Sequence, residues 1–185
     1  MPAVPTAHLH ADAREVLGLW AAPDEQQEDL RLAYLDHLAR HDDAMQRSCA
    51  IGHLTASALM VDEPRERVLL TLHPKVGRWL QLGGHVEPED ASVRAAALRE
   101  SREESGIDEV TVSVAPVRLD RHPVPCAGAM SEHLDVQYLA VVPAGSREVM
   151  SEESDDLRWF HVDALPDGLD ASVRALIRAA VADRA

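Results

Sequence analysis

The sequence predicts an α/β domain that follows a helical prefix, and three observations support this fold class. Residues 25–40 carry apolar side chains at helical spacing, so an N-terminal pair of helices is expected to end near Arg40. From about residue 53 the chain changes to short runs rich in leucine and valine, which are typical of strands. Helical patterns return at residues 90–105 and 169–182. Strands followed by helices in this order indicate an α/β architecture.

The expected elements follow one another along the chain. Helices are predicted at residues 11–20, 25–40, 90–105 and 169–182, and strands at residues 53–61, 67–73, 79–82, 110–119, 133–142 and 157–162. The first two strands are expected to form a hairpin, and Gly106 to end the third helix. Residues 121–132 contain two prolines and are expected to be a loop. We therefore expect a helical extension over residues 1–48 and one domain over residues 49–185.

Composition excludes several classes of function. The 185 residues have a formal net charge of −14, which argues against non-specific binding to nucleic acid or to an anionic membrane surface. A negatively charged small substrate remains compatible, because a bound metal ion can reverse the local field. No apolar run approaches the length of a membrane span, and the N-terminus has no signal-peptide pattern. Cys49 and Cys126 form no CxxC pair and are expected to be free thiols, so a cytoplasmic protein is expected.

Three glutamates share one face of the helix predicted over residues 90–105. Glu100, Glu103 and Glu104 stand at positions i, i+3 and i+4. Their like charges repel and weaken an isolated helix, whereas a hard divalent cation such as Mg²⁺ or Mn²⁺ makes the arrangement favourable. Taken alone, an acidic triplet of this kind is most often a solvated surface.

The residues around this triplet favour a binding site over a solvated surface. Gly83 and Gly84 precede the helix and allow the backbone to turn sharply and to approach a ligand closely. The carbonyl of Gly83 could be a further metal ligand. Arg99 precedes the first glutamate, and its guanidinium could orient a carboxylate or stabilise phosphate charge.

Residues 84–107 resemble the Nudix box, which has the pattern G-x5-E-x7-R-E-U-x-E-E-x-G-U with U an aliphatic residue. The positions that match are Gly84, Arg99, Glu100, Glu103, Glu104, Gly106 and Ile107, while Gly83 and Glu87 fit the common GGxxE start. The predicted strands of residues 50–165 are compatible with the fold of the family. The resemblance therefore implies a Nudix α/β/α sandwich with a mixed sheet, preceded by the helical extension.

The sequence departs from the pattern at three points. Asp90 stands where the pattern has its first glutamate, and eight residues rather than seven separate it from Arg99. Ser101 occupies a position that is normally aliphatic. These departures leave the Arg-Glu-x-x-Glu-Glu face intact, but they leave the role of Asp90 open.

The resemblance implies a chemistry. Nudix hydrolases cleave a diphosphate that is linked to another moiety, using Mg²⁺ or Mn²⁺ and a water nucleophile. By position, Glu100, Glu103 and Glu104 would hold the metal, together with the carbonyl of Gly83. Glu100 or Glu104 would also help to deprotonate the water, and Arg99 would orient Glu100. A diphosphate is anionic and repels hydroxide, so a metal is also required on chemical grounds.

Further site residues lie outside this face. Glu153, in the acidic loop before residue 157, is the candidate for a distal catalytic carboxylate, with Glu152 as the next choice; a solvated charge run explains the loop equally well. The candidate substrate contacts are His85, Lys75, Arg78 and Glu87. His85 could equally shape its loop, and Lys75 and Arg78 could be solvated residues of a hairpin tip.

The preferred function is thus a metal-dependent hydrolase that cleaves a diphosphate bond in a nucleoside diphosphate-linked or related small molecule. The alternative is a Nudix-fold sensor or regulator that binds such a ligand without turnover. A diphosphate isomerase of the same fold would need a catalytic cysteine near the site, and neither cysteine has that context. The N-terminal helices could cover the site, pack on the sheet or build a homodimer, and the sequence does not identify the substrate.

Overall fold

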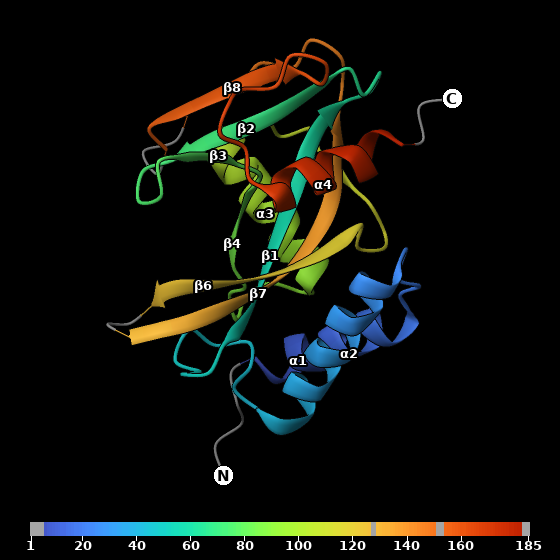
Figure 1. Ribbon diagram of the computed structural model, residues 1–185, viewed down its shortest axis with the longest axis vertical. Helices are drawn as coiled ribbons and strands as arrows, with labels where there is room; N and C mark the ends of the chain where they lie inside the picture. The colour runs from blue at the N-terminus through green and yellow to red at the C-terminus, as the bar shows by residue number, and fades with distance from the viewer. Residues whose placement is uncertain (1–5, 127–128, 151–153, 183–185) are drawn as a thin grey trace.

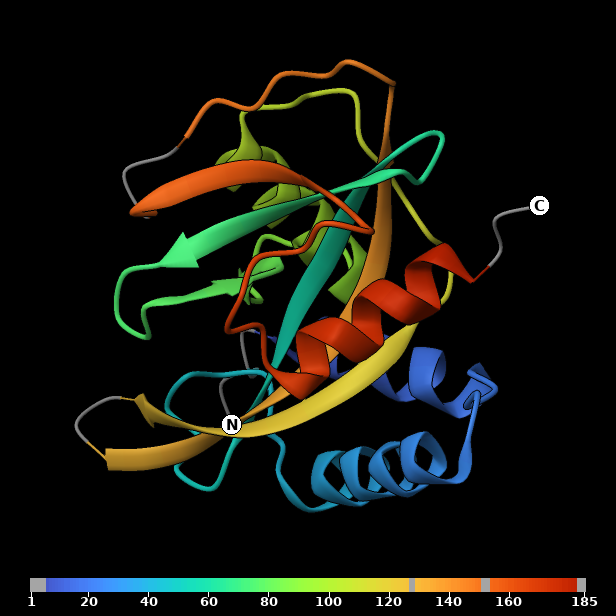
Figure 2. The same ribbon diagram turned by 45° about the horizontal axis from the view of Figure 1, so that its top comes forward.

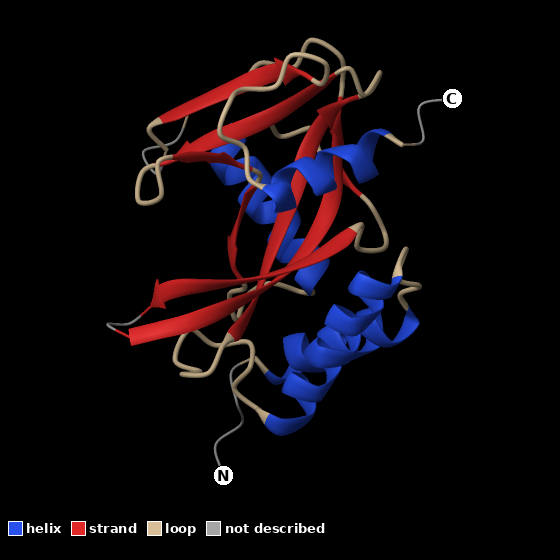
Figure 3. Cartoon of the chain, viewed as in Figure 1, coloured by secondary structure: helices blue, strands red, loops and turns tan. Residues whose placement is uncertain are grey.

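A mixed sheet of eight strands forms the centre of the computed structural model, which describes residues 6–126, 129–150 and 154–182, and helices cover both of its faces (Figure 1, Figure 3). The helices are α1 (Ala7–Leu19), α2 (Glu25–Arg40), α3 (Val93–Ser105) and α4 (Ala171–Val181). The strands are β1 (His53–Asp62), β2 (Arg67–His73), β3 (Arg78–Leu80), β4 (Leu82–His85), β5 (Thr111–Val112), β6 (Arg118–Cys126), β7 (Ala129–Val142) and β8 (Asp156–His161). The predicted α/β class is confirmed.

Strand β1 lies at the middle of the sheet. The strand order is β3-β2-β1-β7-β5, and in addition β4 pairs with β1, β6 with β7 and β8 with β2. The pairing of β1 with β7 is parallel, with His53 opposite His133, whereas the pairings of β1 with β2 and with β4 are antiparallel. Both parallel and antiparallel neighbours therefore meet on one strand, and the predicted β1–β2 hairpin is confirmed.

Alternation along β1 divides the core into two layers. Ala56 and Ala58 pack with α3 and with the N-terminal helices, while Leu59 and Val61 pack with α4 on the opposite face. Figure 2 shows α4 in front of the sheet and α3 behind it. Towards the start of β1, the residues on the α4 face become polar, as described below.

The prediction of a loop over residues 121–132 is wrong, because residues 121–126 belong to β6 and residues 129–132 belong to β7, and the two strands pair. Pro123 and Pro125 are tolerated because alternate residues of a strand turn their N–H groups to the same side. The N–H of Leu119, at the same alternation, points away from β7 and donates to the Gln27 side chain of α2 at 2.6 Å. The two missing N–H groups therefore fall on the outer edge of β6, where the ladder with β7 does not need them.

Two further strand predictions are only partly right. The strand predicted over residues 110–119 is broken by Pro116, which leaves β5 with two residues before β6 begins at Arg118. The strand predicted over residues 79–82 divides at Gln81, because β3 pairs with β2 while β4 crosses over to pair with β1.

The N-terminal helices cover the outer edge of β6 (Figure 1). Gln27 of α2 binds both the N–H and the carbonyl of Leu119 with its amide, much as a neighbouring strand would. Tyr34 is fully buried and donates its hydroxyl to the carbonyl of Asp120 at 2.6 Å. These helices therefore protect a sheet edge that would otherwise expose unpaired backbone groups. Within the described residues, no helix combines the length and the apolar character that crossing a membrane requires.

Candidate functional site

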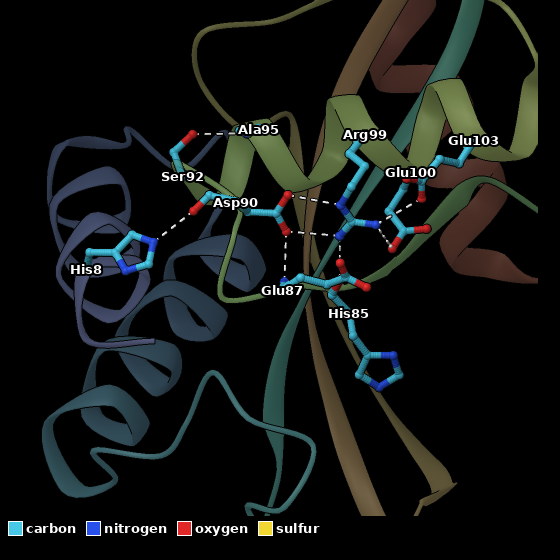
Figure 4. A network of polar contacts seen from close by, with 9 residues as sticks. All are labelled: His8, His85, Glu87, Asp90, Ser92, Ala95, Arg99, Glu100 and Glu103. Carbon is cyan, nitrogen blue, oxygen red and sulfur yellow. Dashed lines mark hydrogen bonds and ion pairs between the residues drawn. The ribbon is translucent and has the colours of Figure 1, made fainter. Parts of the chain in front are cut away.

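Helix α3 carries the acidic face, and its two ends are set by the residues that flank it. The Ser92 hydroxyl accepts from the N–H of Ala95 at 3.0 Å, which caps the first turn (Figure 4). Gly106 ends the helix in the left-handed conformation, with a φ of 66°, as the sequence predicted. Ser101, the unusual residue of the box, is fully buried and donates to the carbonyl of Ala97 at 2.7 Å, so its hydroxyl is satisfied within the helix.

Arg99 is the centre of the polar network that Figure 4 shows. Its Nε and Nη2 donate to the two carboxylate oxygens of Asp90 at 3.0 and 2.9 Å. Its Nη1 donates to Glu100 at 3.0 Å and to Glu103 at 3.1 Å. Its Nη2 also donates to the carbonyl of His85 on β4 at 3.0 Å. The hydrogen bond with Asp90 and the charge of Glu100 raise the pKa of Arg99, so the guanidinium is permanently charged.

Asp90 anchors this network. Its carboxylate is buried, and besides Arg99 it accepts from the N–H of Glu87 at 2.8 Å. The sequence had left the role of Asp90 open, because it is shorter than the glutamate of the pattern and lies one residue further from Arg99. The bidentate geometry assigns it a positioning role, since the planar guanidinium is held in one orientation from one side.

Asp90→Asn is expected to lower the free energy of unfolding by about 2 to 4 kcal/mol, because it leaves part of a buried charge pair uncompensated. The asparagine keeps the size of the side chain but can accept on only one atom. The change is measured by urea unfolding. The matched control is Asp108→Asn, an exposed site beyond the end of α3. Equal loss of stability in both variants would contradict the anchoring role of Asp90.

The backbone of β4 lies against the acidic face. Gly84 faces α3, and a Cβ at this position would lie 2.6 Å from Glu100 Oε1. The N–H of Gly83 donates to Glu104 Oε1 at 3.1 Å. The two glycines thus let the strand approach the carboxylates more closely than any side chain would permit.

The residues of this face fit a hard divalent cation. Glutamate oxygens and a backbone carbonyl are the ligands that Mg²⁺ and Mn²⁺ prefer. The missing Cβ of Gly84 allows the Glu100 carboxylate to lie directly against β4. Arg99 binds both Glu100 and Glu103, and it would orient these carboxylates for such an ion.

Helix α1 supports the same loop from outside the acidic face. Asp12 Oδ2 accepts from the N–H of Val93, the first residue of α3, at 2.7 Å. His8 Nε2 donates to the carbonyl of Asp90 at 2.8 Å (Figure 4). A carboxylate at a helix N-terminus interacts favourably with the helix dipole. The N-terminal extension therefore contributes to the position of α3 and of the loop that precedes it.

The other predicted site residues lie at varying distances from this network. Lys75, in the turn between β2 and β3, and Arg78, on β3, are both exposed. The Glu87 side chain is exposed, and only its backbone N–H joins the network, through Asp90. His85 contributes its carbonyl to Arg99, while its ring points away from the network (Figure 4). Glu152 and Glu153 lie outside the described residues.

Sequence reasoning missed a row of polar side chains on the α4 face of the sheet. The row consists of His53, Thr55 and Ser57 on β1 and His133, Asp135 and Gln137 on β7, and all of them except His133 are buried. We call it the polar row. A signal was present, because polar residues occur at every second position in both strands, as they would on one face of a sheet.

Asp135 is the centre of the polar row. Its carboxylate accepts from Thr55 Oγ1 at 3.0 Å, from Ser57 Oγ at 2.6 Å and from the amide nitrogens of Gln81 and Gln137 at 3.3 and 3.2 Å. Burial raises the pKa of Asp135, although these hydrogen bonds act in the opposite direction. Because the carboxylate binds both amide nitrogens, it turns the amide oxygens of Gln81 and Gln137 away from itself. Within the described residues, neither oxygen has a partner.

Three histidines gather at one end of the polar row. The rings of His53, His85 and His133 have centroids 4.9 to 5.0 Å apart. Burial lowers the pKa of His85 to about 4 and that of His133 to about 3, and the positive charge that neighbouring imidazoles would carry acts in the same direction. All three rings are therefore neutral at pH 7.

These pKa values predict the direction of a pH effect on stability. The pKa of His133 falls from 6.5 in the unfolded chain to about 3 in the folded protein, so protonation favours unfolding. In the presence of a chelator, the free energy of unfolding is expected to be greatest at pH 7 and to fall as the pH drops below about 6.5. Urea unfolding measured from pH 7 to below pH 6.5 tests this prediction. His133→Gln should reduce the dependence of the unfolding free energy on pH, whereas the exposed His161→Gln should not. An unchanged pH dependence in His133→Gln would contradict the assignment.

Comparison with protein families places most of the chain in one of them. The family model described as "NUDIX domain" matches residues 52–180, which include the whole of the polar row, β4 and α3. Among curated proteins, the chain is similar to the NAD-capped RNA hydrolase NudC of Stutzerimonas stutzeri (strain A1501), with 30% identity over 127 residues. This match covers 64% of the chain and 42% of the relative, so the chain spans less than half the length of that protein.

Solved structures agree with this placement. A MutT NUDIX hydrolase from Burkholderia pseudomallei is 26% identical, with a TM-score of 0.51, and the match covers 69% of this chain and 96% of that one. The dihydroneopterin triphosphate pyrophosphohydrolase of E. coli is 20% identical, with a TM-score of 0.56, over 68% of this chain and 92% of that one. The second likeness concerns the fold alone. The part of the chain that precedes residue 52 lies outside the family match.

Proposed function

Since the chain belongs to the Nudix family, we propose that it is a metal-dependent hydrolase that cleaves a diphosphate bond in a nucleoside diphosphate-linked or related small molecule. The observation that carries this proposal is the single guanidinium of Arg99, which joins Asp90, Glu100, Glu103 and the backbone of β4. A solvated acidic surface does not need a buried residue such as Asp90 to hold its side chains in place. An acidic face that must keep one geometry to bind a metal ion does need such a residue.

We propose that Glu100, Glu103 and Glu104, with the carbonyl of Gly83, hold Mg²⁺ or Mn²⁺. When bound, such an ion supplies positive charge to the diphosphate and makes water more acidic. Arg99 orients Glu100 and Glu103 through its Nη1 and is itself held by Asp90. The N–H of Gly83 fixes one oxygen of Glu104.

We propose Glu104 as the general base, with Glu100 as the other candidate. Arg99 binds the Glu100 carboxylate directly and orients it. Glu104 is positioned by a neutral backbone N–H, which keeps its carboxylate against β4. It would accept the proton of the water that attacks phosphorus. If a variant without the Glu104 carboxylate retained activity, Glu153 would become the candidate for the general base, as the sequence suggested.

The curated relative supports a nucleotide-like substrate, because its name describes hydrolysis of NAD-capped RNA. NAD contains a diphosphate between two nucleosides. The exposed cations Lys75 and Arg78 remain proposed phosphate contacts and Glu87 a proposed substrate contact, whereas the ring of His85 points away from Arg99 and the acidic face (Figure 4).

A substrate panel tests the proposal. Purified full-length protein is incubated with NAD, ADP-ribose, dinucleoside polyphosphates, coenzyme A, nucleotide sugars and nucleoside triphosphates, with Mg²⁺, with Mn²⁺ and with EDTA. Phosphate released by a coupled phosphatase reports cleavage of the diphosphate. Metal-dependent turnover of one substrate class that disappears with EDTA is the expected result.

The same panel distinguishes the alternative function. A Nudix-fold sensor would bind one of these ligands without releasing phosphate, so calorimetric binding is measured for each member beside turnover. Tight binding with no turnover under either metal would replace the hydrolase with a sensor. Neither binding nor turnover across the panel would contradict both functions for these ligands.

A further inference from the structure

We propose that His53, His85 and His133 form a binding site for a transition-metal ion of the zinc type. This site is separate from the acidic face of α3, which takes a hard cation. The proposal does not depend on the hydrolase activity, and the observations that carry it are the convergence of the three rings and the unpaired buried nitrogens of His53 and His85.

The sheet itself brings the three histidines together. His53 lies opposite His133 in the parallel pair β1–β7, and His85 lies opposite Thr55, two residues further along β1 on the same face. One ring nitrogen from each histidine lies within 4.8 Å of the other two. Because the three Cα positions are fixed by backbone ladders of the central strands, the arrangement is rigid rather than a chance meeting of surface side chains.

The ring nitrogens lack partners. His53 has no exposed surface, and neither its Nδ1 nor its Nε2 has a hydrogen-bond partner within the described residues. The buried Nε2 of His85 also lacks a hydrogen-bond partner within the described residues. A buried polar atom without a partner costs about 1 to 3 kcal/mol, so three such atoms in one cluster need an explanation. A bound ion would supply the missing partner for one nitrogen of His53 and for Nε2 of His85.

The chemistry of the three groups selects the type of ion. Neutral imidazole nitrogen binds Zn²⁺, Co²⁺, Ni²⁺ and Cu²⁺ well, whereas Mg²⁺ and Ca²⁺ prefer oxygen. Burial keeps the rings neutral at pH 7, as metal ligation requires. Tetrahedral coordination with bonds of about 2.0 Å would place the nitrogens about 3.3 Å apart, so the side chains, whose nitrogens lie within 4.8 Å of one another here, would rotate on binding. Three histidines would leave a fourth position for water or another ligand.

Other charged and titratable groups near the cluster define its surroundings. His122 lies beyond His133, with ring centroids 5.5 Å apart, but its Nδ1 is held by Asp120 at 2.8 Å. Arg47 and Lys75 are the cations that act on these imidazoles, and both side chains are exposed. Their charges oppose a bound cation, but solvent screens them, so three direct nitrogen ligands outweigh this repulsion.

His85 connects the proposed site with the acidic face. Its carbonyl accepts from Arg99, while its ring points away from Arg99 towards the other two histidines (Figure 4). A metal on the ring would fix the end of β4, next to the two glycines that approach Glu100 and Glu104. The ion would therefore support the position of the acidic face without taking part in its chemistry.

Cobalt binding tests the proposal directly. Full-length protein without a polyhistidine tag is stripped with a chelator and titrated with Co²⁺ in excess Mg²⁺, which saturates oxygen sites. The visible absorption of Co²⁺ reports nitrogen ligation, and Zn²⁺ should displace it. We expect one equivalent to bind, with affinity lowered at least about 100-fold in His133→Gln and in His85→Gln.

Two variants serve as controls, and circular dichroism confirms that each variant is folded. His161→Gln removes an exposed histidine of β8, and Glu103→Gln removes an exposed carboxylate of the acidic face; both should bind Co²⁺ as the unaltered protein does. His133 is preferred to the fully buried His53 because its replacement is less disruptive. The proposal is overturned if the unaltered protein binds Co²⁺ no better than His133→Gln, or if Glu103→Gln loses the cobalt and the histidine variants keep it.

Discussion

Glu104→Gln is expected to lower kcat about 10³-fold while the fold remains intact, because it removes a carboxylate that would hold the metal and accept the proton of water. The amide is nearly isosteric with the carboxylate. Its oxygen can still accept from the N–H of Gly83, which the carboxylate now binds at 3.1 Å. The loss of activity should therefore reflect the loss of negative charge and of basicity. It is measured as kcat on the best substrate of the panel, with Mg²⁺ at saturation.

A series of matched amide variants makes this prediction specific. Glu100→Gln should be as severe as Glu104→Gln, because Glu100 is largely buried and is oriented by Arg99. Glu103→Gln should be milder, since the Glu103 side chain is 60% exposed. Glu109→Gln, an exposed site beyond the end of α3, should have no effect. Full activity of Glu104→Gln would remove Glu104 from the mechanism and would direct attention to Glu153.

The fold could be predicted from the sequence wherever a local pattern determined the structure. Helix α2 and strand β2 begin and end at the predicted residues, because α2 has a clear helical periodicity and β2 is a short run rich in leucine and valine. The β6–β7 hairpin could not be predicted in this way. Pro123 and Pro125 disfavour a strand locally, and only the pairing of one edge of β6 with β7 makes them acceptable. The structure of that segment was determined by tertiary contacts, which a local sequence pattern does not contain.

The candidate site could likewise be predicted only in part from local sequence patterns. The three glutamates of α3 and Arg99 were proposed as site residues from their spacing and from the resemblance to the Nudix box, and one helix carries all four. The anchoring role of Asp90 depends on a loop with one extra residue, whose course cannot be read from spacing. The polar row depends on the parallel pairing of β1 with β7, two strands about eighty residues apart in the chain. Alternating polar residues were visible in each strand, but only the pairing shows that they face one another.

Gly83→Ala is expected to destabilise the protein by about 3 to 5 kcal/mol, as the sum of overpacking and of a strained backbone. An added Cβ would lie 2.3 Å from Ser57 Cβ and 2.4 Å from Ser57 Cα, and the latter belongs to the backbone of the central strand β1. The φ of 153° at Gly83 is one that residues with side chains rarely adopt. Neither contact can be relieved by a side-chain rotation, so β4 would have to separate from β1. Thermal and urea unfolding measure the loss.

Gly84→Ala provides the contrast that separates stability from function. The Cβ at Gly84 would meet only the carboxylate of Glu100, at 2.6 to 2.9 Å, and that carboxylate is the end of a flexible side chain. It can move, but moving it displaces Glu100 from Arg99 Nη1 and from its position beside β4. Gly84→Ala should therefore keep its stability and lose most of its metal-dependent activity, whereas Gly83→Ala should lose stability. If Gly84→Ala were fully active, Glu100 would not need its place against β4, and the acidic face would be a surface feature rather than a metal site.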